Sequence, residues 1–335
     1  MRQYSEYTLD RVCEFLTPQK NTLIIFHVRP DADAIGAAFA LKLVLEALGS
    51  KSLCVCESEI PSRLAFLTEN HQRSARFDNM DGSFEFERII TVDTASPSQL
   101  GNLQGLFEDK IDLMIDHHEN GIKYADYYIR SDYAASGEII YEIAKHLVET
   151  GKLQSIPRDA YDLIYAALSS DTGCFKYSNV SPHTHLCAAE LINAGIDAAE
   201  INHRLFDCKS EKMLAAEAAG FQNMKFYHNR KIAAVIFPYE LKHELGLDDE
   251  HLETLVDVAR AVDGVKIAIS ARQSTAYRSF RISLRSSCNF DVSAVAKHFS
   301  GGGHAKAAAC TIEADSIEFA VRLVVDEIIK RWGKN

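Results

Sequence analysis

The sequence has no long apolar run and no basic segment at its start. None of its hydrophobic stretches approaches the roughly 18 residues that a membrane-spanning helix needs. Residues 1–7 are polar, whereas a secretory signal begins with a basic stretch followed by an apolar one. Internal repeats and low-complexity tracts are also missing. We therefore expect a folded, cytoplasmic protein without membrane contact.

The eight cysteines follow no spacing typical of a disulfide framework or a structural zinc site. They are scattered from Cys13 to Cys310, mostly in apolar segments, which is typical of reduced and buried thiols. Cys54 and Cys56 would lie on one face of a strand, but a zinc site would need a second pair of Cys or His beside them. We therefore expect the cysteines to belong to the core.

Positive charge is scarce as well. The chain has 36 Lys and Arg against 47 Asp and Glu, which gives a formal net charge of −11. This balance argues against a broad basic surface that would bind long duplex nucleic acid. It is compatible with a small anionic substrate, because metal ions and a local arginine cluster can reverse the sign of the charge within a cleft.

Strands and helices alternate through the first 196 residues. Short continuous apolar runs predict buried strands at residues 23–28, 52–56, 88–93 and 112–118. Helical patterns are found at residues 8–17, 34–48, 135–148, 159–170 and 182–194. This alternation predicts an α/β fold with a mostly parallel sheet that carries helices on both faces.

The pattern changes near residue 197. Residues 197–226 are rich in Ala, Glu and Lys and predict a helical connector. Beyond it, strands are predicted at residues 231–236, 265–270 and 280–285, followed by helices at 291–299 and 315–332. These elements predict a second, smaller α/β domain over residues 227–335.

Acidic residues and histidines stand where several of these elements end. His27, Asp31 and Asp33 fall within seven residues, between the first strand and the first long helix. A Pro-Asp turn in which Asp33 caps that helix would also explain this stretch. Further candidates at strand or helix ends favour a metal site over a simple turn: Asp93, Asp116, His117, His118 and Asp171.

Parallel strands bring their carboxyl ends to one edge of a sheet, so these side chains are expected to converge. Carboxylates with a few imidazoles suit Mn²⁺ or Mg²⁺ better than zinc. Two such ions that share a bridging carboxylate would polarise a phosphate and generate the hydroxide that attacks it.

Together these motifs resemble those of the DHH/DHHA1 phosphoesterase superfamily, to which RecJ-like exonucleases, family II inorganic pyrophosphatases and nanoRNase/pAp phosphatases belong. The matching motifs are His27-x-x-x-Asp31-x-Asp33, the strand-end Asp93, Asp116-His117-His118, Asp171 in Ser-Asp-Thr-Gly, and Gly301-Gly302-Gly303-His304. One departure is Ala32, which stands where the family usually has glycine. The resemblance implies a DHH catalytic domain over residues 1–196 and a DHHA1 substrate-binding domain over residues 227–335.

The resemblance also implies roles for the motif residues. His27, Asp31 and Asp93 would hold one Mn²⁺. Asp33, Asp93, His117 and Asp171 would hold a second, with Mg²⁺ as the alternative metal. His118 would contact the scissile phosphate. Asp116 would orient the imidazoles, as metal-bound histidines require, although it also fits a simple strand-end cap.

In the second domain, the resemblance assigns substrate binding to two arginines and the glycine motif. Arg272 and Arg285 would hold a non-scissile phosphate or a terminal nucleotide, because the guanidinium fork binds phosphate oxygens in a bidentate manner. Solvated arginines at a strand edge are the alternative. The backbone N–H groups of Gly301, Gly302 and Gly303 would converge on an anion beside His304.

The function that the resemblance implies is hydrolysis of short oligoribonucleotides to mononucleotides, of 3′-phosphoadenosine 5′-phosphate (pAp) to AMP, or of both. Alternatives are a linear or cyclic dinucleotide phosphodiesterase, a RecJ-like single-strand exonuclease, and a nucleotide-binding protein without turnover. The expected partners are short RNA or DNA or a nucleoside bisphosphate. Apolar surface around the connector is compatible with a homodimer. The sequence leaves open the preferred substrate, the polarity of degradation and the native metal.

Overall fold

The computed structural model describes residues 3–69, 75–76, 84–119, 121–273, 275 and 277–332. It divides into two compact units, Met1–Cys208 and Lys209–Asn335. Each unit has its own six-stranded sheet, and each is described by itself. None of the described helices is long and apolar enough to cross a membrane.

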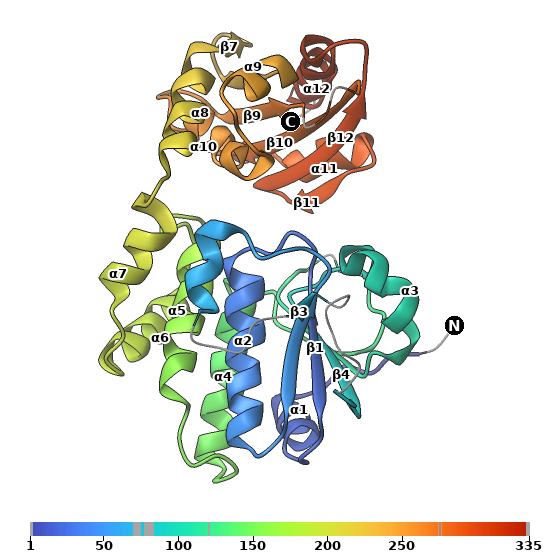
Figure 1. The fold of residues 1–335 in the computed structure, drawn as a ribbon, viewed down its shortest axis with the longest axis vertical. Coiled ribbons are helices and arrows are strands. Elements are labelled where there is room, and N and C mark those ends of the chain that lie inside the picture. The colour runs from blue at the N-terminus through green and yellow to red at the C-terminus, as the bar shows by residue number, and fades with distance from the viewer. Residues whose placement is uncertain are drawn as a thin grey trace. The chain divides into compact units, whose positions relative to one another are not determined.

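The first unit contains a parallel sheet with the strand order β3-β2-β1-β4-β5-β6. Figure 1 labels β1, β3 and β4 of this sheet. Its strands are β1 (Thr22–Phe26), β2 (Ser52–Cys56), β3 (Ala75–Arg76), β4 (Arg88–Val92), β5 (Leu113–Asp116) and β6 (Asp126–Ile129). All pairings within the sheet are parallel. Every residue of β1 and β4 is buried, as expected for central strands that are covered on both faces.

Helices pack on both faces of this sheet. One face is covered by α1 (Leu9–Leu16), α2 (Ala32–Ala47), α4 (Ser136–Glu149) and α5 (Arg158–Asp171). The other face packs against Leu100, Leu103 and Phe107, which lie on the 3₁₀ helix Pro97–Leu103 and on α3 (Gln104–Phe107). The predicted α/β fold class, with a mostly parallel sheet between helices, is confirmed.

The helix α2 is apolar around nearly its whole circumference, which is typical of a buried helix. It lies against α5 at Gly36, where an added Cβ would be 2.4 Å from the carbonyl oxygen of Leu163. Asp31 caps this helix, since its Oδ1 accepts hydrogen bonds from the backbone N–H groups of Asp33 and Ala34. The turn in which Asp33 would be the cap is therefore not the one that forms.

The residues predicted as a connector are divided between the two units. The helix α7 (Ala198–Asn202) and the π turn His203–Asp207 belong to the first unit, and α7 packs on α5. The helix α8 (Glu211–Gln222) belongs to the second unit, where it packs on α10 (Leu255–Arg260). The strand β7 begins within the predicted connector, at Met224.

The second unit contains a mixed sheet with the order β11-β12-β10-β9-β8-β7. Its strands are β7 (Met224–Tyr227), β8 (Ile232–Phe237), β9 (Ile267–Arg272), β10 (Ser279–Ser286), β11 (Gly302–His304) and β12 (Ala307–Glu313). Among the described strands of this unit, only β8 and β9 pair in parallel. One face packs on α11 (Val292–His298) and α12 (Ile317–Trp332), and the β8–β9 part of the other face packs on α8 and α10.

Candidate metal centre

Three neighbouring strands of the first unit end at the same level. Phe26 of β1 pairs with Val92 of β4, and Val92 pairs with Ile115 of β5. Each of these paired residues is followed by a polar one, namely His27, Asp93 or Asp116. These polar residues therefore lie side by side at the carboxyl edge of the sheet. This edge is where parallel α/β sheets place their functional groups.

Helix ends complete the cluster. Asp31 and Asp33 lie at the N-terminus of α2, and Asp171 is the last residue of α5. His117 Nε2 is 3.4 Å from Asp171 Oδ2, 3.6 Å from Asp93 Oδ1 and 3.7 Å from Asp33 Oδ2. The structure thus brings one imidazole and three carboxylates from four different elements together.

A second group shares Asp93 with the first. His27 Nε2 is 3.5 Å from Asp93 Oδ2 and 3.7 Å from Asp31 Oδ2. In each of two sets, His27/Asp31/Asp93 and Asp33/Asp93/His117, the potential ligand atoms all lie within 4.8 Å of one another. Two atoms that are each about 2.1 Å from a shared cation are at most about 4.2 Å apart, so the separations to the imidazoles fit common coordination.

The backbone of Asp93 is in the left-handed region, with φ 54°. An aspartate there costs conformational energy, and such residues cluster at functional sites. Asp93 is 2 % exposed, and each of its carboxylate oxygens lies near a different histidine. The strained conformation places one carboxylate between the two groups.

The N-terminus of α4 holds two of these carboxylates. The backbone N–H groups of Ser136 and Gly137 donate to Asp33 Oδ2 at 2.7 Å and Oδ1 at 2.9 Å. The Ser136 hydroxyl donates to Asp93 Oδ1 at 2.9 Å. The free N–H groups at a helix N-terminus favour negative charge, so Asp33 satisfies them in place of a side-chain cap on Ala135.

Asp116 fixes the second histidine of the Asp-His-His motif. Its Oδ1 lies 2.7 Å from His118 Nδ1, and it accepts from the backbone N–H of His117 at 2.8 Å. Burial opposes a charged ring, but the hydrogen bond and negative charge of Asp116 outweigh it and raise the pKa of His118 to about 10. The Asp116 side chain therefore orients His118 and, with the charges of Asp93 and Asp171, favours its charged form.

The remaining carboxylates influence one another strongly. Burial and the nearby charges of Asp93 and Asp171 raise the pKa of Asp33 well above its usual value. Burial and the charges of Asp31 and Asp93 do the same for the pKa of Asp171. Since so many carboxylates lie close together, divalent cations are the natural counterions for this cluster.

Sequence reasoning missed Ser136 and Gly137. Both stand at the start of a predicted helix, where small residues are common, so nothing local distinguishes them. The structure explains why alanine is tolerated at position 32. It is the first residue of α2, with a backbone outside the left-handed region, so its methyl group fits without strain.

The predicted substrate-binding residues of the second unit lie on or beside three strands of its sheet: β9 and β10, which are neighbours, and β11, which β12 separates from β10. Arg285 is on β10, and its Nη1 donates to the carbonyl oxygen of Leu284 at 3.1 Å. Arg272 ends β9, is 8 % exposed and donates from Nη1 to the carbonyl oxygen of Asp249 at 2.9 Å. His304 is exposed at the end of β11.

The glycine motif is a short strand that packs on β12. Gly302, Gly303 and His304 pair with Ala309, Ala308 and Ala307. A Cβ at Gly301 would be 2.2 Å from the carbonyl oxygen of Ala309, and one at Gly303 would be 2.5 Å from that of Ala307. Close approach to β12 therefore explains these two glycines, whereas a Cβ at Gly302 would meet open space.

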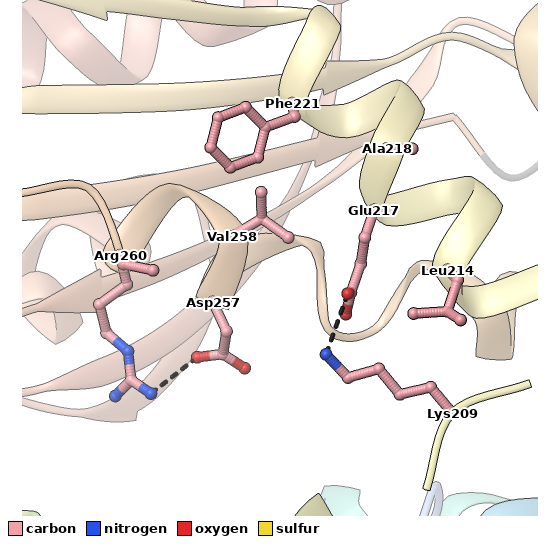
Figure 2. Close-up of a pocket in the computed structure, with 9 residues that line it drawn as sticks. Lys209, Leu214, Glu217, Ala218, Phe221, Asp257, Val258 and Arg260 are labelled. Carbon is pink, nitrogen blue, oxygen red and sulfur yellow. Dashed lines mark hydrogen bonds and ion pairs between the residues drawn. The ribbon is translucent and has the colours of Figure 1, made fainter. Parts of the chain in front are cut away.

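A pocket of about 680 Å³ opens between α8 and α10 of the second unit (Figure 2). Leu214, Phe221 and Val258 form its apolar part. Two ion pairs lie along it, Lys209–Glu217 at 2.9 Å and Arg260–Asp257 at 3.0 Å. None of the predicted site residues lines this pocket.

Models of known families match one segment in each of the two units. The model of the DHH family, N-terminal domain, matches residues 21–168. The model of the DHHA1 domain matches residues 229–330. Together these two matches cover about three quarters of the chain.

Curated relatives match over most of their length. The bifunctional oligoribonuclease and PAP phosphatase NrnA of Bacillus subtilis is 28% identical, over 89% of this chain and 92% of that protein. The protein of the same name from Thermus thermophilus is 24% identical, over 91% of this chain and 88% of that protein. An exopolyphosphatase-related protein from Bacteroides fragilis has the same fold, with a TM-score of 0.87, 21% identity and coverage of 97% and 96% of the two chains.

Proposed function

The chain belongs to the DHH/DHHA1 family of phosphoesterases, and from this premise we propose that it is a metal-dependent hydrolase of short nucleotides. Its substrates are short oligoribonucleotides, cleaved to mononucleotides, and pAp, converted to AMP. The observation that carries the proposal is the cluster in which Asp93 lies 3.5 Å and 3.6 Å from two histidines of different strands. The names of relatives that match nearly their full length support the choice of substrates.

The donor set fits two divalent cations. His27, Asp31 and Asp93 would hold one, and Asp33, Asp93, His117 and Asp171 would hold the other. The site combines hard carboxylate oxygens with two imidazoles and no thiolate, which suits Mn²⁺ or Mg²⁺. When bound, such ions lower the pKa of water and neutralise charge on a phosphate.

The chain's own residues would orient and complete this chemistry. Asp116 holds the ring of His118 by its Nδ1, so His118 donates from Nε2 to an oxygen of the scissile phosphate. Ser136 and the N-terminus of α4 hold Asp93 and Asp33 in place while charge develops on the phosphate. In the second unit, Arg285 binds a phosphate that is not cleaved.

A substrate panel tests the proposal. The full chain is incubated with Mn²⁺ or Mg²⁺ and with pAp, a 5′-phosphorylated dinucleotide, a cyclic dinucleotide or a long single-stranded RNA, and the products are separated by chromatography. We expect metal-dependent hydrolysis of pAp and of the linear dinucleotide, with slow degradation of the long RNA. Preferred cleavage of the cyclic dinucleotide or of the long RNA would contradict the proposed substrate class.

Two aspartate variants test the site. Asp93→Asn should abolish turnover, because it weakens the carboxylate that both cation sites share. Asp112→Asn is the matched control, since Asp112 precedes β5 while the cluster follows it, and its Oδ2 accepts only a backbone N–H of β4 among the bonds described. Full turnover by Asp93→Asn would show that the cluster is not the catalytic centre.

A further inference from the structure

The loop between β1 and α2 carries an arginine in a strained backbone conformation. Arg29 has φ 54°, in the left-handed region that residues with a Cβ seldom adopt. It also precedes Pro30, and the residue before a proline is normally driven toward an extended conformation. Both preferences oppose the observed backbone, so contacts from neighbouring segments must hold it.

Two other loops of the first unit supply these contacts. The backbone N–H of Val28 donates to the carbonyl oxygen of Gln99 at 2.8 Å, on the 3₁₀ helix that follows β4. The backbone N–H of Arg29 donates to Ser58 Oγ at 3.0 Å, just beyond the end of β2. The conformation of Arg29 is therefore fixed by contacts within the first unit.

The fold explains the strained backbone but not the choice of side chain. The loop reverses the chain, which brings Asp31 Oδ2 to 3.7 Å from His27 Nε2. Glycine or asparagine adopts a left-handed conformation more readily than arginine and would make the same turn at lower cost. The Arg29 side chain is exposed, and its guanidinium group makes no hydrogen bond or ion pair with any of the residues that the structure describes. Neither the turn nor packing therefore accounts for an arginine here.

Arg29 lies midway between two residues of the candidate metal centre. It is two residues from His27 and two from Asp31, and consecutive Cα atoms are about 3.8 Å apart, so its Cα is at most about 7.6 Å from theirs. Arginine has one of the longest side chains and can span such a distance. A phosphate that is bound beside His27 and Asp31 is therefore within reach of the guanidinium group.

The chemistry of a phosphate gives this position a use. A terminal phosphate carries a charge of about −1.5 to −2 at neutral pH and has three acceptor oxygens. The planar guanidinium fork donates two parallel hydrogen bonds to such oxygens and keeps its positive charge at any pH at which the protein is folded. Strained residues cluster at functional sites, where the surrounding structure maintains them for the sake of the side chain.

We propose that Arg29 binds the scissile phosphate from the first unit, by donating from its guanidinium group to oxygens of that phosphate. This inference rests on the proposed function, in which the scissile phosphate lies beside His27 and Asp31. Arg285 binds a phosphate that is not cleaved, so the two arginines act on different phosphates of one substrate. Arg29 also stabilises the charge that develops on the scissile phosphate during the reaction.

Equilibrium binding to the full chain in Mn²⁺ tests this assignment with two probes. One is an analogue of pAp in which a methylene group replaces the ester oxygen of the 3′-phosphate, so that it is not cleaved. The other is AMP, which lacks the 3′-phosphate. We expect Arg29→Gln to weaken binding of the analogue about 10–100-fold, as for the loss of a hydrogen bond between charged groups, and to change AMP binding less than twofold.

Three further variants separate phosphate binding from structure. Arg29→Gly should bind the analogue as weakly as Arg29→Gln, yet unfold at a temperature no lower than the wild type, since glycine adopts this φ without strain. Arg29→Lys should recover part of the affinity, because lysine keeps the charge but loses the fork. Arg158→Gln is the matched control. Arg158 is exposed at the start of α5, about 20 Å from Asp171 at the other end of that helix, and its loss should leave both affinities unchanged.

The outcomes distinguish this inference from the proposed function. An unchanged affinity for the analogue in Arg29→Gln, or an equal loss for the analogue and AMP, would overturn the role of Arg29 and leave the hydrolysis of pAp untouched. A lower unfolding temperature in both Arg29→Gln and Arg29→Gly would show that the arginine serves the fold, which would overturn it as well. If the wild-type protein binds the analogue through Arg29 but releases no AMP from pAp, the phosphate contact stands and the proposed hydrolysis is wrong.

Discussion

The hydroxyl of Ser136 is the most informative single group to remove from the candidate metal centre. Ser136 is fully buried, and its Oγ donates to Asp93 Oδ1 at 2.9 Å. Asp93 is itself 2 % exposed, so water does not replace a lost donor. Ser136→Ala should leave a buried carboxylate short of one hydrogen bond while keeping the start of α4 and its two backbone bonds to Asp33.

The size of the effect follows from the charge of the acceptor. A hydrogen bond to a charged group contributes about 1.5–3 kcal/mol. In a unit of this size, a loss of about 2 kcal/mol lowers the unfolding temperature of the metal-free protein by roughly 4–8 °C. Residues that orient metal ligands typically change metal affinity by about 10–100-fold, so the Mn²⁺ concentration for half-maximal hydrolysis should rise at least about tenfold.

The assay is a Mn²⁺ titration of pAp hydrolysis, together with calorimetric titration of Mn²⁺ into the metal-free protein. Ser169→Ala is the matched control, because Ser169 is also fully buried and donates its hydroxyl to Asn202 at 2.5 Å. We expect the control to lose stability without any change in Mn²⁺ dependence. An unchanged Mn²⁺ titration in Ser136→Ala would refute the argument that Ser136 positions Asp93 for a cation.

Two other predictions concern His118 and the glycine strand. Because the pKa of His118 is raised to about 10 from an ordinary 6.5, the metal-free protein should lose stability between about pH 6.5 and 10, as seen in unfolding temperatures. His118→Gln should flatten that part of the pH profile, and an unaltered profile would exclude His118 as its source. Gly303→Ala should destabilise the second unit by about 1–3 kcal/mol in chemical denaturation, because its Cβ meets the Ala307 carbonyl oxygen at 2.5 Å at a φ of 133°. Gly302→Ala, which meets nothing within 4 Å, is the control, and equal stability of the two variants would mean that β11 does not pack as described.

The parallel sheet of the first unit was predictable because burial on both faces leaves continuous apolar runs. Residues 23–26 and 89–92 are almost entirely apolar, so the sequence predicts both strands and identifies the polar residues that follow them. Convergence of His27, Asp93 and Asp116 then follows from parallel pairing alone. Parallel pairing alone does not predict that Asp171 lies near these residues, because α5 must also end at the same edge of the sheet.

The strands that escaped prediction depend on tertiary contacts. The strand β12 is rich in alanine, which has little strand preference, and it forms because it pairs with β10 along seven residues. Its partner β11 contains Gly302 and Gly303, and glycine also has little strand preference. Pairing decided the outcome, because Gly301 and Gly303 allow an approach to β12 that any side chain would prevent.

Ser136 escaped prediction for a related reason. Its role depends on where α4 begins relative to Asp33 and Asp93, which are 103 and 43 residues away in the sequence. The N-cap of α2 also depends on where a helix begins, although the residues concerned are close together in the sequence. Asp31 and Asp33 are both good N-cap residues, and only the observed start of the helix at Ala32 selects Asp31, which leaves Asp33 to accept the N–H groups of α4.

Under the proposed function, the two units bind the negative charge of a nucleotide with different groups, and this difference affects the order of binding. The first unit offers carboxylates, whose negative charge repels a phosphate until cations are bound. Under the proposed function, Arg285 of the second unit binds a phosphate of the substrate without a cofactor. Substrate binding in EDTA should therefore be weakened by salt, while hydrolysis should depend on the cation first. Under the proposed function, a protein with a formal net charge of −11 binds a polyanion through cations in the first unit and through Arg285 in the second.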